Sequence, residues 1–359
     1  MTILEAAYDL GLDLTVRSCG VDFNWRLTFQ ADVLLGFPVS TQGCMLSAHP
    51  PLVPIIHADD CGLSAGITES ILACFDHGWL RRTSVVVNGD GWSHAVAELR
   101  RRPTLGVSLH LNLFEGRPLS NPSELDLLVD ERGQFYRGFA AQWLRGLSGV
   151  RAARLRGQIR LELRRQIERF LGAFGDRKPF LVDGHIHFHV LPMFFDELMA
   201  LCAEYPIAGI RLPRERFCWP AVRNAPQVRM LNLTKCAVLR ALCRRADRAL
   251  HARGVSTADA FIGVIGTGAM TLEYVSAALN HLHAIGTSGT VEILFHPGRA
   301  RADEASLWSD RPALQEFYLS EERDREAELL RSTDLGRLLG AYRAPGSDLR
   351  PARSAEFAR

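Results

Sequence analysis

The chain has 359 residues, of which 47% are hydrophobic and 23% charged, and 42 Lys and Arg against 40 Asp and Glu leave a formal net charge of only +2. This composition is typical of a folded globule with one large domain or two ordinary ones, and it excludes disordered, collagen-like and membrane-embedded classes. A surface that follows nucleic acid normally carries a marked basic excess, so no nucleic-acid partner is predicted.

The first 50 residues precede the first clear strand. Glu5 and Asp9 come before the first arginine, so this stretch lacks the positive start of a signal peptide. No apolar run reaches the roughly 20 residues that a membrane-spanning helix needs. We therefore expect a cytoplasmic protein with an N-terminal extension of unknown role over residues 1–50.

Short apolar runs bounded by turn residues predict seven strands, and the stretches between them have helical periodicity. In one such stretch Ile67, Ile71 and Phe75 recur every four residues, which predicts a helix with one buried face. Alternation of strand and helix implies parallel strands, and about seven units favour an α/β fold of the (β/α) barrel type over an open doubly wound sheet. The predicted strands cover residues 52–58, 83–87, 105–111, 180–187, 207–212, 261–265 and 290–295.

The barrel is predicted to occupy residues 51–340, with a flexible tail over 341–359. A basic helical insertion at about 139–171 interrupts it, with Leu155, Ile159, Leu163 and Ile167 at fourfold spacing. Its arginines could rest on anionic lipid headgroups, but we rank such membrane-surface contact below an ordinary solvated helix face.

The first chemical signal is the pair Asp59 and Asp60, which follows the strand 52–58. Two adjacent carboxylates repel each other unless a cation or a proton resolves the conflict, and active sites of barrels lie at the carboxyl ends of strands. The alternative is that the pair caps the following helix together with Ser64.

The second signal is a row of polar residues at every second position, Asp183, His185, His187 and His189. In an extended strand this period of two sends all four side chains to one face. A row of imidazoles inside a barrel suits a divalent transition metal, and the alternative is a hydrogen-bonded histidine cluster.

Two further strands end in histidine. His110 and Asn112 share a face at the end of the strand 105–111, and His296 follows the strand 290–295 directly before a Pro-Gly turn. One Asp and two His from three strands would form a three-ligand site with open positions, the arrangement of a hydrolytic metal centre. His296 could then reach a leaving group as a general acid.

Four stretches, ADDCGLS, SLHLNL, DGHIHFHVLP and EILFHPG, resemble in order and spacing the motifs of the YdjC-like (ChbG/HpnK) carbohydrate deacetylases, over residues 53 to about 335. The resemblance implies a barrel similar to that of NodB-type polysaccharide deacetylases, one divalent metal ion, and a hydrolase that removes acetyl from N-acetylated amino sugars. Residues 127–135 and 210–217 look closest to the hopanoid-biosynthesis branch, which acts on a glycolipid; an N-acetylglucosamine-type oligosaccharide is the alternative substrate.

By motif position, the resemblance implies that Asp60, His110 and His185 bind the metal, which is expected to be zinc or magnesium, with cobalt or manganese as alternatives. It implies Asp59 as the catalytic base and His296 as the acid. Four more residues are expected near the substrate or behind the ligands, namely His187, His189, Asn112 and Arg211.

Two rival functions use the same ligands. A non-catalytic sugar-binding protein would use the metal only to stabilise its structure, and it would need neither Asp59 nor His296. A barrel metallo-phosphoesterase would need more cations than Arg211 and Arg214 near its strand ends. The oligomeric state is not predicted.

Overall fold

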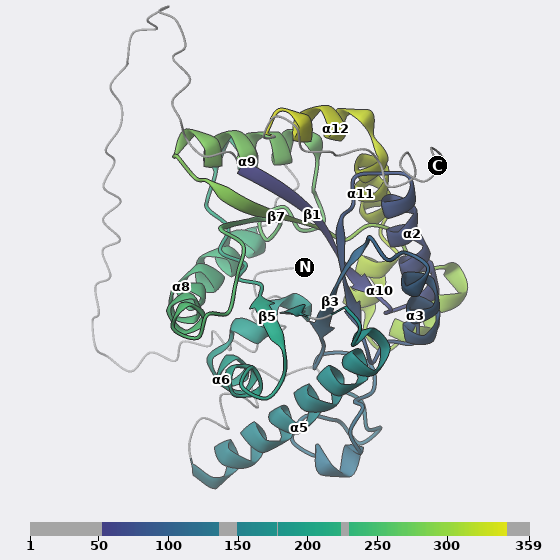
Figure 1. Ribbon diagram of the computed structural model, residues 1–359. Helices are drawn as coiled ribbons and strands as arrows, with labels where there is room; N and C mark the ends of the chain where they lie inside the picture. Colours follow the sequence, from purple (N-terminus) through teal and green to yellow (C-terminus); the bar gives the residue numbers. More distant parts are fainter. Residues whose placement is uncertain (1–51, 136–148, 178, 224–229, 343–359) are drawn as a thin grey trace, which may run out of the picture.

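A computed structural model describes residues 52–135, 149–177, 179–223 and 230–342 (Figure 1). The predicted N-terminal extension, the first part of the predicted insertion and nearly all of the predicted tail lie outside the described residues.

The described residues form one sheet of seven parallel strands in the order β5-β4-β3-β2-β1-β7-β6. The sheet curls, and its edge strand β5 meets the segment before β6 at a parallel bridge between Gly209 and Ser256, where the Ile210 N–H donates to the Ser256 carbonyl over 2.9 Å. The predicted α/β barrel is thereby confirmed. The strands are β1 (Leu52–Cys61), β2 (Arg82–Val86), β3 (Gly106–Leu111), β4 (Phe180–Gly184), β5 (Ile207–Ile210), β6 (Ala260–Ile262) and β7 (Gly289–Phe295).

Helices surround the sheet (Figure 1). The first, α2, begins after Ser64, whose hydroxyl accepts from the Ile67 N–H, and it buries the predicted face of Ile67, Ile71 and Phe75. The α-helices are α2 (Ala65–Asp76), α3 (Trp92–Arg100), α5 (Gly149–Phe174), α6 (Pro192–Leu201), α7 (Trp219–Arg223), α8 (Met230–Ala252), α9 (Leu272–Ala284), α10 (Pro312–Tyr318), α11 (Glu321–Arg331) and α12 (Thr333–Gly340). Three 3-10 helices are η1 (Pro122–Glu124), η2 (His185–Val190) and η3 (Ala302–Trp308).

Helix α5 contains residues 149–171 of the predicted basic insertion and supports the loop after β3. The four apolar positions that repeat every fourth residue are all buried. Beside them, the Glu162 carboxylate accepts from the N–H groups of Leu119 and Ser120, and the Gln166 amide oxygen accepts from the Asn112 N–H. Because these buried acceptors are paired with backbone donors of the loop that follows His110, α5 fixes that loop.

Strand β4 is shorter than predicted. It ends at Gly184, and residues His185–Val190 form η2, in which Ile186 and His187 have φ values of 50° and 65°. The prediction that alternation continues through His189 and sends four polar side chains to one face is therefore wrong. Glycine is required at 184 because a Cβ there would lie 2.8 Å from Nδ1 of His189, which folds back against it.

Candidate active site

The end of β1 is irregular and brings two carboxylates to the mouth of the barrel. The pairing register with β2 shifts between Ala58 and Cys61, and Asp60 has a φ of 73°, a left-handed conformation that costs a non-glycine residue about 1–3 kcal/mol. Neither carboxylate caps α2, because Ser64 does so, and Glu304 accepts from the N–H groups of Ala65 and Gly66. The capping alternative is therefore wrong.

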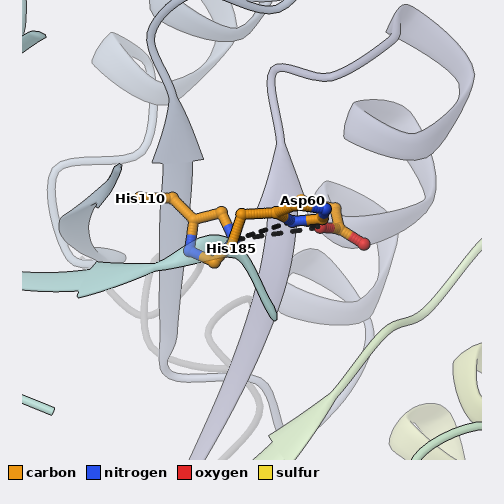
Figure 2. Close-up of side chains that lie close together, drawn as sticks. All are labelled: Asp60, His110 and His185. Carbon is orange, nitrogen blue, oxygen red and sulfur yellow. Dashed lines mark hydrogen bonds and ion pairs between the residues drawn. The ribbon is translucent and has the colours of Figure 1, made fainter. Parts of the chain in front are cut away.

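Asp60, His110 and His185 converge from β1, β3 and the start of η2 (Figure 2). Oδ1 of Asp60 lies 3.9 Å from Nε2 of His110 and 3.5 Å from Nδ1 of His185, and these two nitrogens are 3.4 Å apart. All three side chains are buried. The three predicted ligands thus present one donor atom each to a common point.

A second carboxylate orients each imidazole. Nδ1 of His110 donates to Asp183, and because a carboxylate only accepts, the lone pair of the ring lies on Nε2. Nε2 of His185 lies 3.0 Å from Oε1 of Glu115, which leaves Nδ1 toward Asp60. Carboxylates that hold the far nitrogen of a metal-binding histidine are the usual supports of such sites.

Glu115 is itself firmly held. Its carboxylate accepts from the Tyr318 hydroxyl and, over 2.8 Å, from Nε1 of Trp308. Asn112 builds the loop beneath it, since its amide oxygen accepts from the Phe114 and Glu115 N–H groups. Asn112, predicted near the substrate or behind the ligands, therefore acts on the site through Glu115.

Oδ1 of Asp60 is buried and lacks a hydrogen-bond partner within the described part of the chain, whereas Oδ2 accepts from Nη1 of Arg323 over 3.0 Å. Burial alone would raise the pKa of Asp60, but His185 and Arg323 lower it well below its usual value. Burial likewise opposes the charged form of His185, yet Asp60 and Glu115 raise its pKa to about 10. Asp60 therefore carries a negative charge, and a cation that binds here would displace a proton from His185.

A divalent cation fits this donor set. Ligand atoms about 2.1 Å from a tetrahedral ion stand roughly 3.4 Å apart, which is close to the separations of 3.4–3.9 Å observed here. One carboxylate oxygen and two imidazole nitrogens suit zinc, cobalt, manganese or magnesium.

Asp59 lies in a second, adjacent network around Arg211. The guanidinium donates to both carboxylate oxygens of Asp59, over 2.7 and 2.9 Å, and also contacts Asp183 and Glu292. Burial would raise the pKa of Asp59, but the charges of Arg211, His110 and His57 together hold the pKa well below its ordinary value. His57, Asp59 and Asp183 form a second group whose ligand atoms lie close together. The positive charge of Arg211 beside this group opposes the binding of a metal cation there.

His296 follows β7, which pairs directly with β1. Its backbone N–H donates to Glu326 over 2.6 Å, its ring meets Phe317 edge-on, and its Nδ1 is buried without a partner in the described residues. Burial lowers the pKa of His296 to about 4, against the charges of Asp60 and Asp59, so the ring is neutral at pH 7.

His187 and His189 do not join the cluster of three donors. The ring of His187 packs edge-on against Phe261 at 5.8 Å, and Nε2 of His189 donates to the Arg211 carbonyl over 2.8 Å. Their buried rings line the Arg211 side of the site instead.

The sequence patterns did not assign four residues of this site: Glu115, Asp183 as a partner of His110, Arg323 and Lys235. Two of them had a signal, since Asp183 belongs to the alternating row and Glu115 opens the EGRPLS stretch after the SLHLNL motif. Lys235 on α8 is half-buried, and its charge acts on Asp59, His187 and His296. Desolvation lowers the pKa of Lys235 to about 8, against the opposing charge of Asp59.

Residues 54–341 match the family model described as YdjC-like protein. A carbohydrate deacetylase of Mus musculus is 30% identical over 80% of this chain and 91% of its own length. A chitooligosaccharide deacetylase of Serratia marcescens is 35% identical over 45% of this chain, and the match spans only 59% of that relative.

A solved structure from Enterococcus faecalis, described as a candidate cellobiose-phosphate cleavage protein, superposes with a TM-score of 0.58. It covers 82% of this chain and 95% of its own, at 18% sequence identity. At this identity the likeness supports the fold alone.

Proposed function

The chain belongs to the YdjC-like protein family, and on this premise we propose that it is a metal-dependent hydrolase that removes acetyl from an N-acetylated amino sugar. Relatives that bear the name carbohydrate or chitooligosaccharide deacetylase support the reaction. The observation that carries the proposal is the set of three buried donors of Asp60, His110 and His185, 3.4–3.9 Å apart, with both imidazoles oriented by carboxylates.

Asp60, His110 and His185 would hold the cation, which supplies a positive charge that polarises the acetyl carbonyl and lowers the pKa of water. Asp183 and Glu115 keep the two rings in the required tautomer. Asp59, ionised by its pairing with Arg211, is available to accept the proton that water loses as its oxygen bonds to the acetyl carbon.

When the C–N bond breaks, the departing amine needs a proton, and His296 would donate it. Because burial keeps His296 neutral at pH 7, the ring must first gain a proton within the site, and protonated Asp59 is a source. The products are acetate and a cationic amino sugar. The substrate is then an N-acetylglucosamine-type oligosaccharide or a glycolipid with the same sugar.

The phosphoesterase alternative is disfavoured because the two arginine side chains that it would need are already engaged. Arg211 is bound to Asp59, and Arg214 donates to Asp247 and to the Ala258 carbonyl. Neither guanidinium is free for a transferred phosphoryl group.

Acetate release from N-acetylglucosamine oligomers tests the function. We expect release that a chelator abolishes and that zinc, cobalt, manganese or magnesium restores, because the proposed reaction needs the cation. Oligomer binding without acetate release, measured by calorimetry with each metal, would favour the sugar-binding alternative. Phosphate release from a sugar phosphate, with none of acetate, would favour the phosphoesterase.

We expect His296→Gln to retain its metal and to lose amide turnover by about a hundredfold or more, because an amine leaves poorly without a proton. An activated acetate ester, whose leaving group needs no proton, should be hydrolysed almost as fast as by the parent. Metal content and rates on both substrates check this. Equal losses on amide and ester would exclude His296 as the acid.

A further inference from the structure

Four large apolar side chains stand exposed on α7, α8 and the segment before them. Phe217 and Trp219 are 46% and 61% exposed, and their rings lie 6.2 Å apart; Met230 and Val238 on α8 are 68% and 49% exposed. Scattered single apolar residues are common on protein surfaces, but Phe217 contacts Trp219 and also shares a groove with α8, and such a contiguous patch marks an interaction site. We call these four residues and the groove beside them on α8 the α8 surface; Figure 1 labels the helix.

A groove of about 360 Å³ runs along this surface. Its walls combine apolar side chains with two arginines. The lining residues are Phe217, Leu233, Cys236, Ala237, Arg240, Ala241 and Arg244.

The positive charge of the α8 surface is not neutralised by carboxylates. Within the described ranges, Arg240, Arg244 and Arg248 form no ion pair, and the one acidic residue of α8, Asp247, pairs with Arg214 over 2.7 Å. These arginines lie one helical turn apart, so they follow one side of the helix.

The arginines of α5 differ in this respect. Arg154 pairs with Asp126, Arg160 with Glu197, and Arg164 with Glu204, each within 2.8 Å. The basic insertion considered from the sequence therefore has much of its charge satisfied within the protein, and α8 is the better site for an external anionic surface.

The same helix also borders the candidate active site. Lys235, one residue before groove-lining Cys236, acts electrostatically on Asp59, His187 and His296. Helix α8 also packs against η2, so docking through its outer side would place the candidate active site behind this helix.

We propose that the α8 surface docks the protein on an anionic lipid bilayer. Phe217, Trp219 and Met230 would enter the headgroup region, and Arg240 and Arg244 would pair with lipid phosphates, as in interfacial amphipathic helices. Docking of this kind needs no spanning segment, and no helix among the described residues is long and apolar enough to cross a bilayer.

Sedimentation with vesicles tests the proposal on the full-length protein. The parent is expected to sediment with vesicles of equal parts phosphatidylcholine and phosphatidylglycerol, and not with phosphatidylcholine alone. Arg240→Gln with Arg244→Gln should weaken binding by roughly thirtyfold, since each arginine near such a surface contributes about 1 kcal/mol. Trp219→Ser should weaken it as well, and excess inorganic phosphate should not compete.

The matched control is Arg151→Gln with Arg165→Gln on α5, which removes the same charge from exposed positions and should bind like the parent. Failure of the parent to sediment, or equal losses in the α8 and α5 variants, would overturn the proposal. A parent dimer that Trp219→Ser converts to a monomer, seen by size exclusion without vesicle binding, would assign the surface to a second copy instead. Vesicle binding requires no catalysis, so it can fail while the deacetylase activity stands, and the reverse.

Discussion

His185→Ala is expected to fold but to lose its metal and its activity together, and His110→Ala and Asp60→Asn should do the same. Each substitution removes one of the three donors that, among the residues the structure describes, meet at one point. Loss of a supporting group alone typically costs about 10–100-fold in metal affinity, so loss of a donor should cost at least about a hundredfold. Elemental analysis of the purified variants and calorimetric titration with zinc check this.

The thermal unfolding midpoint of each variant shows whether metal loss arises from unfolding, because each substitution leaves a buried partner without its bond. His185→Ala keeps Glu115 hydrogen-bonded to Tyr318 and Trp308, whereas Asp60→Asn leaves Arg323 buried beside a neutral amide. Asp60→Asn should therefore be less stable than His185→Ala. Full metal content in His185→Ala would show that another imidazole holds the ion, which would require η2 to move His187 or His189 away from Phe261 and Arg211.

Asp59→Asn is expected to keep the metal and to lose about a hundredfold or more in kcat, because a general base typically contributes that much. Asp59 is not among the three converging donors, and both of its oxygens accept from Arg211. The substitution leaves a buried guanidinium with only Asp183 and Glu292 as carboxylate partners, so some loss of stability should accompany it.

Ser84→Ala is the matched control for Asp59→Asn. The Ser84 hydroxyl donates to Oδ1 of Asp59 over 2.7 Å and lies 3.2 Å from Nδ1 of His110, which keeps Asp183 as its partner. Removal of the hydroxyl therefore perturbs the same carboxylate without changing its charge. We expect this variant to keep most of its turnover. If Asp59→Asn instead loses metal while Asp60→Asn retains it, the two carboxylates have exchanged roles.

The sequence by itself determined the parallel barrel, and its resemblance to family motifs indicated the three residues whose donor atoms converge. Strand ends can be read from short apolar runs, and parallel strands with helical crossovers bring all their carboxyl ends to one side of the sheet. Asp60 and His110 could therefore be paired without coordinates, even though β2 lies between their strands. His185 was chosen by its motif position, while the period-two reasoning around it failed.

The tertiary structure decided the features that depend on contacts between residues far apart in the sequence or on irregular backbone conformation. An argument from periodicity assumes that the strand continues. It therefore cannot predict that β4 ends at Gly184 and that η2 follows. Arg323 reaches Asp60 across 263 residues, and Trp308 and Tyr318 reach Glu115 across 193 and 203. Such contacts depend on how α10, α11 and η3 pack over the barrel mouth, which no local pattern encodes. The tertiary structure also decides which arginines form ion pairs. Arginines on α5 meet carboxylates in the folded chain, whereas Arg240 and Arg244 of α8 form no ion pair in the described residues.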